Sequence, residues 1–238
     1  MILAKNMSIS ITCIDALTYD PTIYALNRTI ETLKGKVDVT KVYWFSDIPF
    51  PGTCVYPVVW VKIPKFTDWQ KQYAFITLKL CPHICTEDFN LIIHSDGYAV
   101  NADAWTDEFL EYDYLGATWD DGVVGNGGFS LRSRRLYDVI ISRDIPYATE
   151  SYGDIDMKNI HTLQDGVPKI PEDVIICRIW KDVLEKEDNI KFAPHELANR
   201  WSVENHSSIA PWTGQPNLWL GKSLGFHGKM GIRNFYNV

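Results

Sequence analysis

The segment at residues 90–97 combines an apolar run with a carboxylate directly after it. Residues 90–94 have the apolar pattern of a buried strand in a parallel sheet, and Asp96 follows within a Ser-Asp-Gly turn. Ligands of open α/β sheets bind beyond the carboxyl ends of the strands, so the position of Asp96 favours a binding role. A carboxylate oxygen at this edge is also a suitable ligand for a hard divalent cation.

A second candidate segment is a glycine cluster, in which Gly125, Gly127 and Gly128 surround Asn126. Because glycine has no Cβ, the backbone of such a loop can approach a ligand closely. We expect Asn126, Gly127 and Gly128 to line the site, and the two adjacent glycines to adopt positive φ, which a Cβ disfavours. A tight turn also needs glycines and is the structural alternative.

The elements that must position these residues follow an α/β pattern. Residues 7–14 and 41–45 are predicted strands, and the spacing of apolar residues predicts a helix from residue 20 that Gly35 ends. A strand, a helix and a strand in this order indicate a parallel sheet with a right-handed crossover. Further helices are expected at 69–80, 104–111, 134–143, 172–184 and 195–201, and further strands at 112–116, 129–131 and 191–193.

Aspartates also end the first two predicted strands. Asp15 and Asp47 are therefore candidate contacts for a nucleotide at the same edge of the sheet, although strand-end turns use aspartate for their own hydrogen bonds. No G-x-G-x-x-G motif follows the first strand, which argues against a dinucleotide-dependent oxidoreductase. The segment at 144–171 has weak periodicity and is expected to form a loop over the site.

Five short blocks occur in one order along the chain: HSDG at 94–97, YDYLGATW at 112–119, GNGGFSLRSR at 125–134, PEDV at 171–174 and GFHG at 225–228. Together they resemble the DUF5672 family of glycosyltransferase-like proteins, from about residue 69 to the end. The resemblance implies an α/β fold class: a single GT-A-like domain over residues 1–238, with a Rossmann-type mixed sheet flanked by helices. Asp96 stands for the last aspartate of the family's DxD element, whose first position is His94 in this chain.

The same resemblance implies a metal-dependent glycosyltransferase that moves a sugar from a nucleotide donor, expected to be UDP-linked, to a hydroxyl acceptor with inversion. Asp96, His94 and His227 would hold Mn²⁺ or Mg²⁺, and an aspartate with imidazoles suits Mn²⁺ better than Ca²⁺. Asp173 would take the acceptor proton as general base, and Glu172 would hold an acceptor hydroxyl. The residues expected at the donor are Asp15, Asp47, Lys71, Asp96, Asn126, Gly127 and Gly128.

Several of these roles have simpler structural explanations that the sequence leaves open. Glu172 and Asp173 follow a proline, as is typical of a helix N-terminus, where acidic side chains suit the helix dipole. Lys71 is explained more simply by a solvated surface position, and His227 by a hydrogen-bonded structural histidine. A different function is also open, a catalytically silent carbohydrate-binding protein that uses Trp201, Trp212 and Trp219.

The composition and net charge of the chain limit which partners it can be expected to bind. A chain of 238 residues with 46% hydrophobic and 22% charged residues suits one globular α/β domain. The net charge of −7 provides no overall attraction to nucleic acid or to an anionic membrane. The expected acceptor is a glycan, and the alternative is a hydroxymethylated DNA base, which would have to be flipped out of the duplex.

The cysteines and the apolar runs bear on the compartment. Five cysteines without a disulfide-framework spacing indicate free thiols in a reducing compartment. Cys81 and Cys85 lack a second ligand pair, so a structural zinc site is not expected. The sequence has no signal-peptide pattern and no apolar run long enough to cross a bilayer, and we therefore expect a cytoplasmic protein without a membrane segment.

Overall fold

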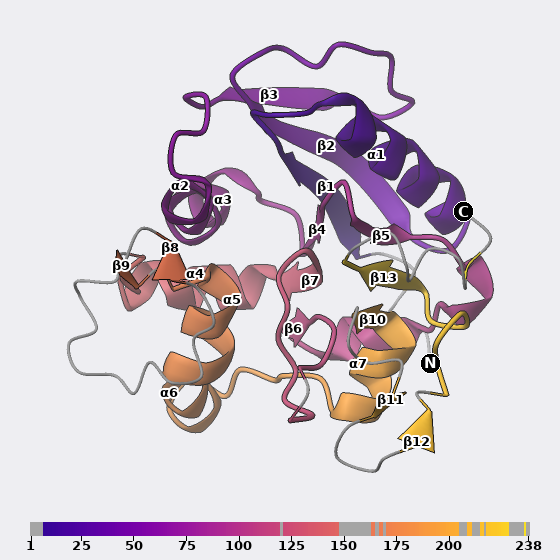
Figure 1. The fold of residues 1–238 in the computed structure, drawn as a ribbon, viewed down its shortest axis with the longest axis vertical. Coiled ribbons are helices and arrows are strands. Elements are labelled where there is room, and N and C mark those ends of the chain that lie inside the picture. The colour runs from indigo at the N-terminus through magenta and orange to yellow at the C-terminus, as the bar shows by residue number, and fades with distance from the viewer. Residues whose placement is uncertain are drawn as a thin grey trace.

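A mixed six-stranded sheet forms the centre of the computed structural model, with the strand order β3-β2-β1-β4-β7-β6 (Figure 1). Strands β3, β2, β1 and β4 are parallel, β7 runs antiparallel to β4, and β6 runs antiparallel to β7. Their bounds are β1 Ser8–Ile14, β2 Asp38–Ser46, β3 Val58–Lys62, β4 Phe89–Ile93, β6 Tyr114–Leu115 and β7 Phe129–Ser133. The structure describes residues 7–119, 121–147, 163–164, 167–168, 170–204, 209–210, 215–216, 218–228 and 236.

The central strands are buried on both faces, which explains their continuous apolar runs. Every residue of β4 is buried. On β2, Trp44 belongs to the apolar cluster on one face, whereas its neighbours Tyr43 and Phe45 belong to the cluster on the other. Successive strand side chains point to opposite faces, so both faces need a cover.

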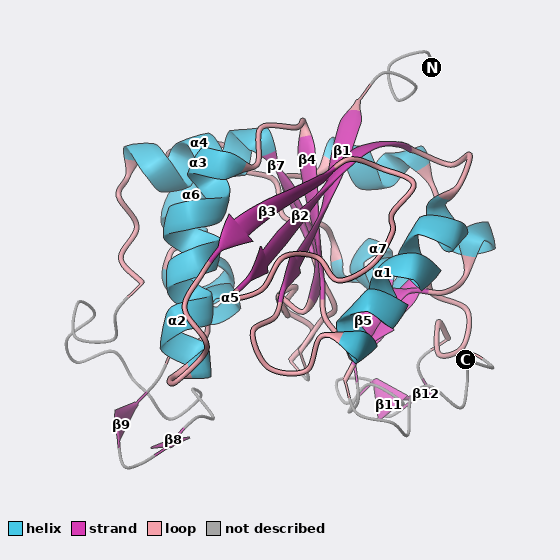
Figure 2. Ribbon diagram, turned by 90° about the horizontal axis from the view of Figure 1, so that it is seen from above, coloured by secondary structure: helices cyan, strands magenta, loops and turns pink. Residues whose placement is uncertain are grey.

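Helices provide that cover in two layers (Figure 2). Leu26 and Trp201 anchor the first layer in one apolar cluster, and Tyr73, Leu136 and Ile175 anchor the second layer in the other. The first layer contains α1 (Asp20–Leu33) and α7 (His195–Trp201). The second contains α2 (Trp69–Phe75), α3 (Cys81–Ile84), α4 (Arg134–Ser142), α5 (Glu172–Val174) and α6 (Lys181–Lys186).

A smaller sheet with the strand order β10-β13-β5 joins the late part of the chain to the segment that follows β4. It consists of β5 (Gly97–Ala99), β10 (Ser202–Glu204) and β13 (Gly225–His227), and β5 packs against α1. Two short antiparallel pairs complete the described strands, β8 (Leu163–Gln164) with β9 (Val167–Pro168) and β11 (Ile209–Ala210) with β12 (Gln215–Pro216).

The expected fold class is confirmed, since the sheet is mixed, of Rossmann type and flanked by helices. The predicted helix at 69–80 extends further than expected, because a π-helical turn, Ile76–Leu80, connects α2 to α3. The predicted helix at 172–184 is likewise interrupted by a π-helical turn, Ile175–Ile179. Such turns are frequent near functional sites.

One other prediction of local structure is wrong and one is confirmed only in part. The segment at 191–193 is not a strand, because it pairs only through a single bridge between Tyr114 and Phe192. The short helix expected at 104–111 is confirmed in part, as the 3₁₀-helix Asp107–Glu111, which follows a separate 3₁₀-helix, Ala102–Ala104. Both segments are short, so their local sequence pattern does not determine their secondary structure, and the packing around them does.

Some expectations fall outside the described residues. Of the loop expected at 144–171, residues 148–162, 165–166 and 169 are not described, and neither is Trp212. Among the helices that are described, none combines the length and the apolar character that crossing a bilayer requires.

Candidate functional site

The site begins with the turn that ends β4. The amide of His94 donates to the Gly97 carbonyl at 2.9 Å, and the amide of Gly97 donates back to the His94 carbonyl at 3.1 Å. The chain then enters β5, which pairs antiparallel with β13, so that His227 lies opposite Gly97. The amide of Gly228 donates to the Asp96 carbonyl at 2.8 Å. The pairing of these two strands therefore brings His227 beside Asp96.

His94, Asp96 and His227 form a cluster of possible metal ligands. Each offers one ligand atom, and these three atoms lie within 4.8 Å of one another. Ligand atoms about 2.1 Å from a shared ion lie about 3.0–3.4 Å apart when adjacent and about 4.2 Å apart when opposite, so the three side chains would have to close around the ion. His227 Nε2 lies 3.7 Å from Asp96 Oδ1, and the two imidazole rings are 5.6 Å apart. The three residues expected to hold a metal are thus brought together, and their donor set fits a divalent cation.

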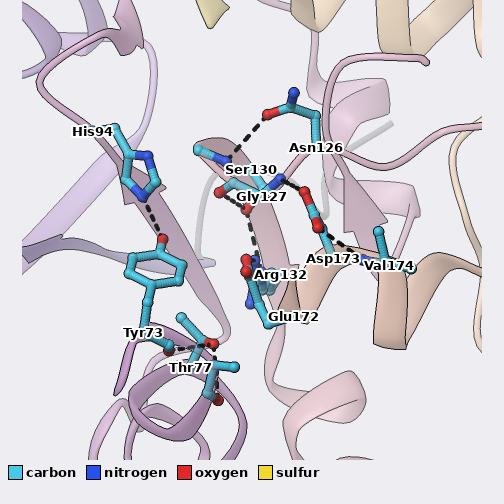
Figure 3. A network of polar contacts seen from close by, with 12 residues as sticks. Tyr73, Thr77, His94, Asn126, Gly127, Ser130, Arg132, Glu172, Asp173 and Val174 are labelled. Atoms are coloured by element: carbon cyan, nitrogen blue, oxygen red, sulfur yellow. Dashed lines mark hydrogen bonds and ion pairs between the residues drawn. The ribbon is translucent and has the colours of Figure 1, made fainter. Parts of the chain in front are cut away.

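The imidazole of His94 has a fixed hydrogen-bond partner. Its Nε2 lies 2.5 Å from the hydroxyl of Tyr73 on α2, which leaves Nδ1 for an ion (Figure 3). Burial, together with the charge of His227, lowers the pKa of His94 to about 3. The ring is therefore neutral, as a metal-binding imidazole must be. Nδ1 can ligate only if Nε2 carries the hydrogen and Tyr73 accepts it.

The pKa of His227 is shifted in the opposite direction from that of His94. Burial lowers its pKa, but the carboxylates of Glu204 and Asp96 outweigh burial and raise the pKa above its usual value. Glu204 Oε1 lies 3.6 Å from His227 Nδ1. A cation bound through this imidazole must displace its proton, so metal binding should weaken as the pH falls.

Glycines make room for the ring of His227. A Cβ on Gly97 would lie 2.6 Å from His227 Cδ2, and a Cβ on Gly128 would lie 2.0 Å from His227 Nε2. Neither Gly127 nor Gly128 has positive φ, so that part of the expectation for the glycine loop is wrong, and Asn126 has the positive φ of 47° instead. Glycine is needed at Gly97 and Gly128 because the imidazole of His227 lies where a Cβ would be.

The start of β7 places the glycine loop at this edge. Because β7 runs antiparallel to β4, its first residue, Phe129, pairs with the last residue of β4, Ile93. The loop that precedes Phe129 therefore meets the turn that follows Ile93. The Asn126 side chain accepts a hydrogen bond from the Gly128 amide at 3.3 Å, so it stabilises the loop itself.

Asp173 approaches the same loop from α5. Its Oδ2 accepts from the Gly127 amide at 2.8 Å and its Oδ1 from the Val174 amide at 2.8 Å. Burial, and then the charge of Glu172, raise its pKa to about 7, although the two backbone amides act in the opposite direction. A carboxylate with this pKa has the protonation behaviour of a general base at neutral pH.

Glu172 has a different position from its neighbour. Its side chain is buried, and Oε1 accepts from Nη2 of Arg132 at 2.8 Å (Figure 3). The acidic pair is therefore split, with Glu172 in a buried ion pair and Asp173 against the glycine loop. The contact of Glu172 with an acceptor hydroxyl remains a prediction, and its observed partner is Arg132.

The two aspartates after β1 and β2 are linked through Tyr19. Asp15 caps the turn before α1, and the Tyr19 hydroxyl donates to Asp47 Oδ1 at 2.8 Å. Tyr19 has a positive φ of 48°, an uncommon conformation for a side chain of this size. The structural alternative for Asp15, a role in forming the turn, is confirmed. Its carboxylate accepts hydrogen bonds from the amides of Leu17, Thr18 and Tyr19 and from the hydroxyls of Thr18 and Thr22.

Lys71 does not share the helix face that meets the cluster. It is exposed in the first turn of α2, two residues before the buried Tyr73. Residues two apart on a helix do not face each other, so the side chain of Lys71 is directed elsewhere. Its expected contact with a diphosphate remains a prediction.

Sequence reasoning missed two side chains that organise this site. Tyr73 lies at helical spacing from apolar residues such as Ile76, a pattern that indicates only a core position. Arg132 lies close in sequence to Arg134 and Arg135, a cluster that is typical of a solvated face, yet it is fully buried in β7. The strand alternation of Ser130 and Arg132, which puts both on one side of β7, is the signal that could have identified it.

Fold and site together define a mixed α/β domain with a cluster of imidazoles and carboxylates at the carboxyl edge of its sheet. Residues 66–221, about two thirds of the chain, match the family described as "Protein of unknown function (DUF5672)". The chain belongs to this family, as its sequence blocks predicted. No curated protein matches the chain.

The first prediction concerns the hydrogen bond between Tyr73 and His94. Tyr73→Phe should weaken Mn²⁺ binding about 10–100-fold, because the phenyl ring cannot accept the Nε2 hydrogen that orients His94. Electron paramagnetic resonance titration of Mn²⁺ measures the effect. Tyr137→Phe is the matched control, since it removes another buried hydroxyl, which donates to Asn90 at 2.8 Å. Equal affinities in both variants would contradict the role of Tyr73.

The second prediction concerns the space beside His227. Gly128→Ala should displace the imidazole and lower the Mn²⁺ affinity while the protein stays folded, because the added methyl group occupies the position of Nε2. The same Mn²⁺ titration and a thermal melt check it. In the control Gly52→Ala, the new Cβ would lie 3.3 Å from the end of the Phe50 side chain, which can move aside. Unchanged Mn²⁺ binding in folded Gly128→Ala protein would remove His227 from the ligand set.

Proposed function

We propose that this protein is a metal-dependent glycosyltransferase with a GT-A-like site, which transfers a sugar from a nucleotide-sugar donor to a hydroxyl acceptor. One observation carries the proposal: Gly127 contacts Asp173 while the next residue, Gly128, contacts His227. A carboxylate with a pKa of about 7 and a set of metal ligands therefore lie on either side of one dipeptide. Transfer to a hydroxyl needs this combination of a base and a site for the leaving diphosphate.

Each residue then has a specific task. A divalent cation held by His94, Asp96 and His227 would supply the charge that neutralises a diphosphate leaving group. Asp173 accepts the proton of the acceptor hydroxyl on a carboxylate oxygen, while the Gly127 amide keeps Oδ2 in place. Attack from the side of Asp173, opposite the leaving group, inverts the anomeric configuration.

The donor's nucleoside would lie along the ends of β1 and β2. Tyr19 and Asp47 occur there, and their hydrogen bond, with the turn that Asp15 caps, gives that edge a fixed shape. Asp15 also acts electrostatically on His94. A UDP-linked sugar is the donor we propose, with Mn²⁺ or Mg²⁺ as the metal.

For the acceptor we propose a glycan. A hydroxymethylated DNA base is disfavoured because a chain with a net charge of −7 repels a polyanion, and nucleic-acid binding depends on cationic contacts with phosphates. We do not propose the DNA base as an acceptor, but we include it among the acceptors to be tested. We propose a soluble acceptor in the cytoplasm, the compartment that the sequence predicts.

A silent carbohydrate-binding function has less support. Trp201, one of the three tryptophans expected to contact sugar, is fully buried and stacks on Phe129 at 4.8 Å, so a ligand cannot reach it. Trp219 is half-buried beside Arg200. A binding module would also gain nothing from a carboxylate whose pKa is raised to about 7.

The donor set supports a second candidate function. Two imidazoles and one carboxylate are also the ligands of non-haem Fe(II) oxygenases, and His94, Asp96 and His227 supply that set. Oxygen consumption with Fe(II) and a 2-oxoacid would distinguish this function from sugar transfer.

The third prediction tests the proposed reaction. Sugar nucleotides incubated with glycan and hydroxymethylated-DNA acceptors should give a transfer product that requires Mn²⁺ and is lost on chelation, as mass spectrometry would show. Asp96→Ala should abolish transfer, whereas Asp103→Ala, which removes an exposed carboxylate nearby in sequence, should not. Near-normal turnover of Asp96→Ala at saturating donor would refute the metal role.

The fourth prediction concerns pH. Since Asp173 acts as a base only when ionised, kcat should rise about tenfold per pH unit below the pKa of Asp173 and level off above it. That pKa is about 7 without the cation, and the bound cation lowers it. Asp173→Asn should lower kcat by roughly 10²–10⁴ and remove this inflection, with little effect on donor KM. Asp182→Asn, at an exposed ion pair with Lys186, is the control. A product that keeps the donor's anomeric configuration would contradict the inverting role of Asp173.

A further inference from the structure

Arg132 is a fully buried guanidinium directly beneath the candidate site. It lies on β7 with no exposed side-chain surface, and the ring of Tyr114 lies 5.5 Å from its Cζ. Its Nε donates to Ser130 Oγ at 3.2 Å, and its Nη2 donates to Glu172 Oε1 at 2.8 Å. Its Nη1 is buried and has no hydrogen-bond partner among the described residues.

Such an arrangement is costly for folding. The desolvation of two buried charges can exceed their mutual attraction, and apolar residues of similar volume often stabilise a core as well. The orphaned Nη1 adds a further cost. The arginine therefore needs an explanation other than stability, and its contacts indicate one.

These contacts close a ring around the glycine loop and the start of α5 (Figure 3). Ser130 Oγ, which accepts from Arg132, donates to the Gly127 carbonyl at 2.9 Å. The Gly127 amide donates to Asp173, the neighbour of Glu172, which in turn pairs with Arg132. A Cβ on Gly127 would lie 2.0 Å from Glu172 Oε1 and 2.9 Å from Arg132 Nη2, so the loop is pressed onto the ion pair.

We propose that Arg132 is the positioning residue of this site: its two divergent N–H groups hold the glycine loop through Ser130 and α5 through Glu172, which fixes Asp173 against the Gly127 amide. The role of Asp173 as the base rests on the proposed function, but its position does not. The planar fork is essential, because a lysine ammonium cannot reach Ser130 and Glu172 together in the same geometry.

The test uses Arg132→Lys, which keeps the positive charge beside Glu172. In the wild-type protein, the Gly127 amide proton resonance should follow the ionisation of Asp173 through pH 7, since an amide hydrogen-bonded to a carboxylate responds to its charge. In Arg132→Lys this response should be lost.

The kinetic effect should follow the same change. The kcat of sugar transfer by Arg132→Lys should be about 10²-fold lower, which is the scale expected when a catalytic group is slightly misplaced, and the donor KM and the Mn²⁺ affinity should be unchanged. Glu172 on its own helix and Glu204 on β10 act on Asp173. The described groups that respond to its charge are Tyr73 on α2, Tyr114 on β6, Cys177 in the π-helical turn and His227 on β13.

Two further variants separate positioning from folding. Arg132→Met combined with Glu172→Leu removes both buried charges, so the protein should keep its melting temperature and still lose the Gly127 response. Arg135→Lys changes an exposed arginine that pairs with Asp113 at 3.4 Å and should leave both the response and kcat unchanged.

The outcomes are distinct from those that test the function. An unaltered Gly127 response in folded Arg132→Lys protein, or a normal kcat, would overturn the proposal for Arg132. A response lost in Arg132→Lys, in a protein that transfers no sugar from any donor tested, would support the positioning role and reject the glycosyltransferase.

Discussion

The candidate site depends on the close packing of one imidazole against two glycine backbones. His227 arrives on β13, far along the chain from the turn after β4, and its ring has space only because Gly97 and Gly128 lack a Cβ. The turn that leads into β5 and the glycine loop that leads into β7 therefore both contact β13, which lies much later in the chain. Because interiors are close-packed and do not deform continuously, this contact fixes the relative positions of the metal-ligand cluster and the glycine loop.

Burial acts on the two sides of this contact in opposite ways. For His94, burial and a neighbouring imidazole favour the neutral ring, whereas for Asp173 burial and a neighbouring carboxylate favour the protonated acid. Glu172 pairs with Arg132, whereas Asp173 accepts hydrogen bonds from two backbone amides. The ion pair therefore explains how two adjacent carboxylates come to have different environments and different roles.

The sequence predicted those features that depend on local patterns. The apolar run before Asp96, the helix that ends at Trp201 and the order of strands and helices all follow from periodicity and turn residues. It also identified His94, Asp96 and His227, which the structure brings together. What it could not supply was any contact between side chains distant in sequence. The hydroxyl of Tyr73 counted as part of an apolar face, and only the fold shows it against His94.

The glycine loop illustrates the same limit. Glycine in a sequence indicates either a special φ or a close approach, and the sequence does not say which. Positive φ was expected at Gly127 and Gly128, but the structure places it at Asn126 and gives the glycines side-chain neighbours instead. Those neighbours, Glu172 and His227, come from segments that follow much later in the chain.

The charges of the site account for the metal dependence that we propose. The carboxylates of Asp96, Glu204 and Asp173 all raise the pKa of His227, so they act together at one point. A nucleoside diphosphate approaching three carboxylates and one imidazolium would be repelled, by about 4 kcal/mol for each like-charge pair at 4 Å near a protein surface. A divalent cation in the cluster reverses the sign of that interaction, and its charge also favours the ionised form of a nearby carboxylate such as Asp173. The same cation that makes the diphosphate donor bind would thereby make the base available.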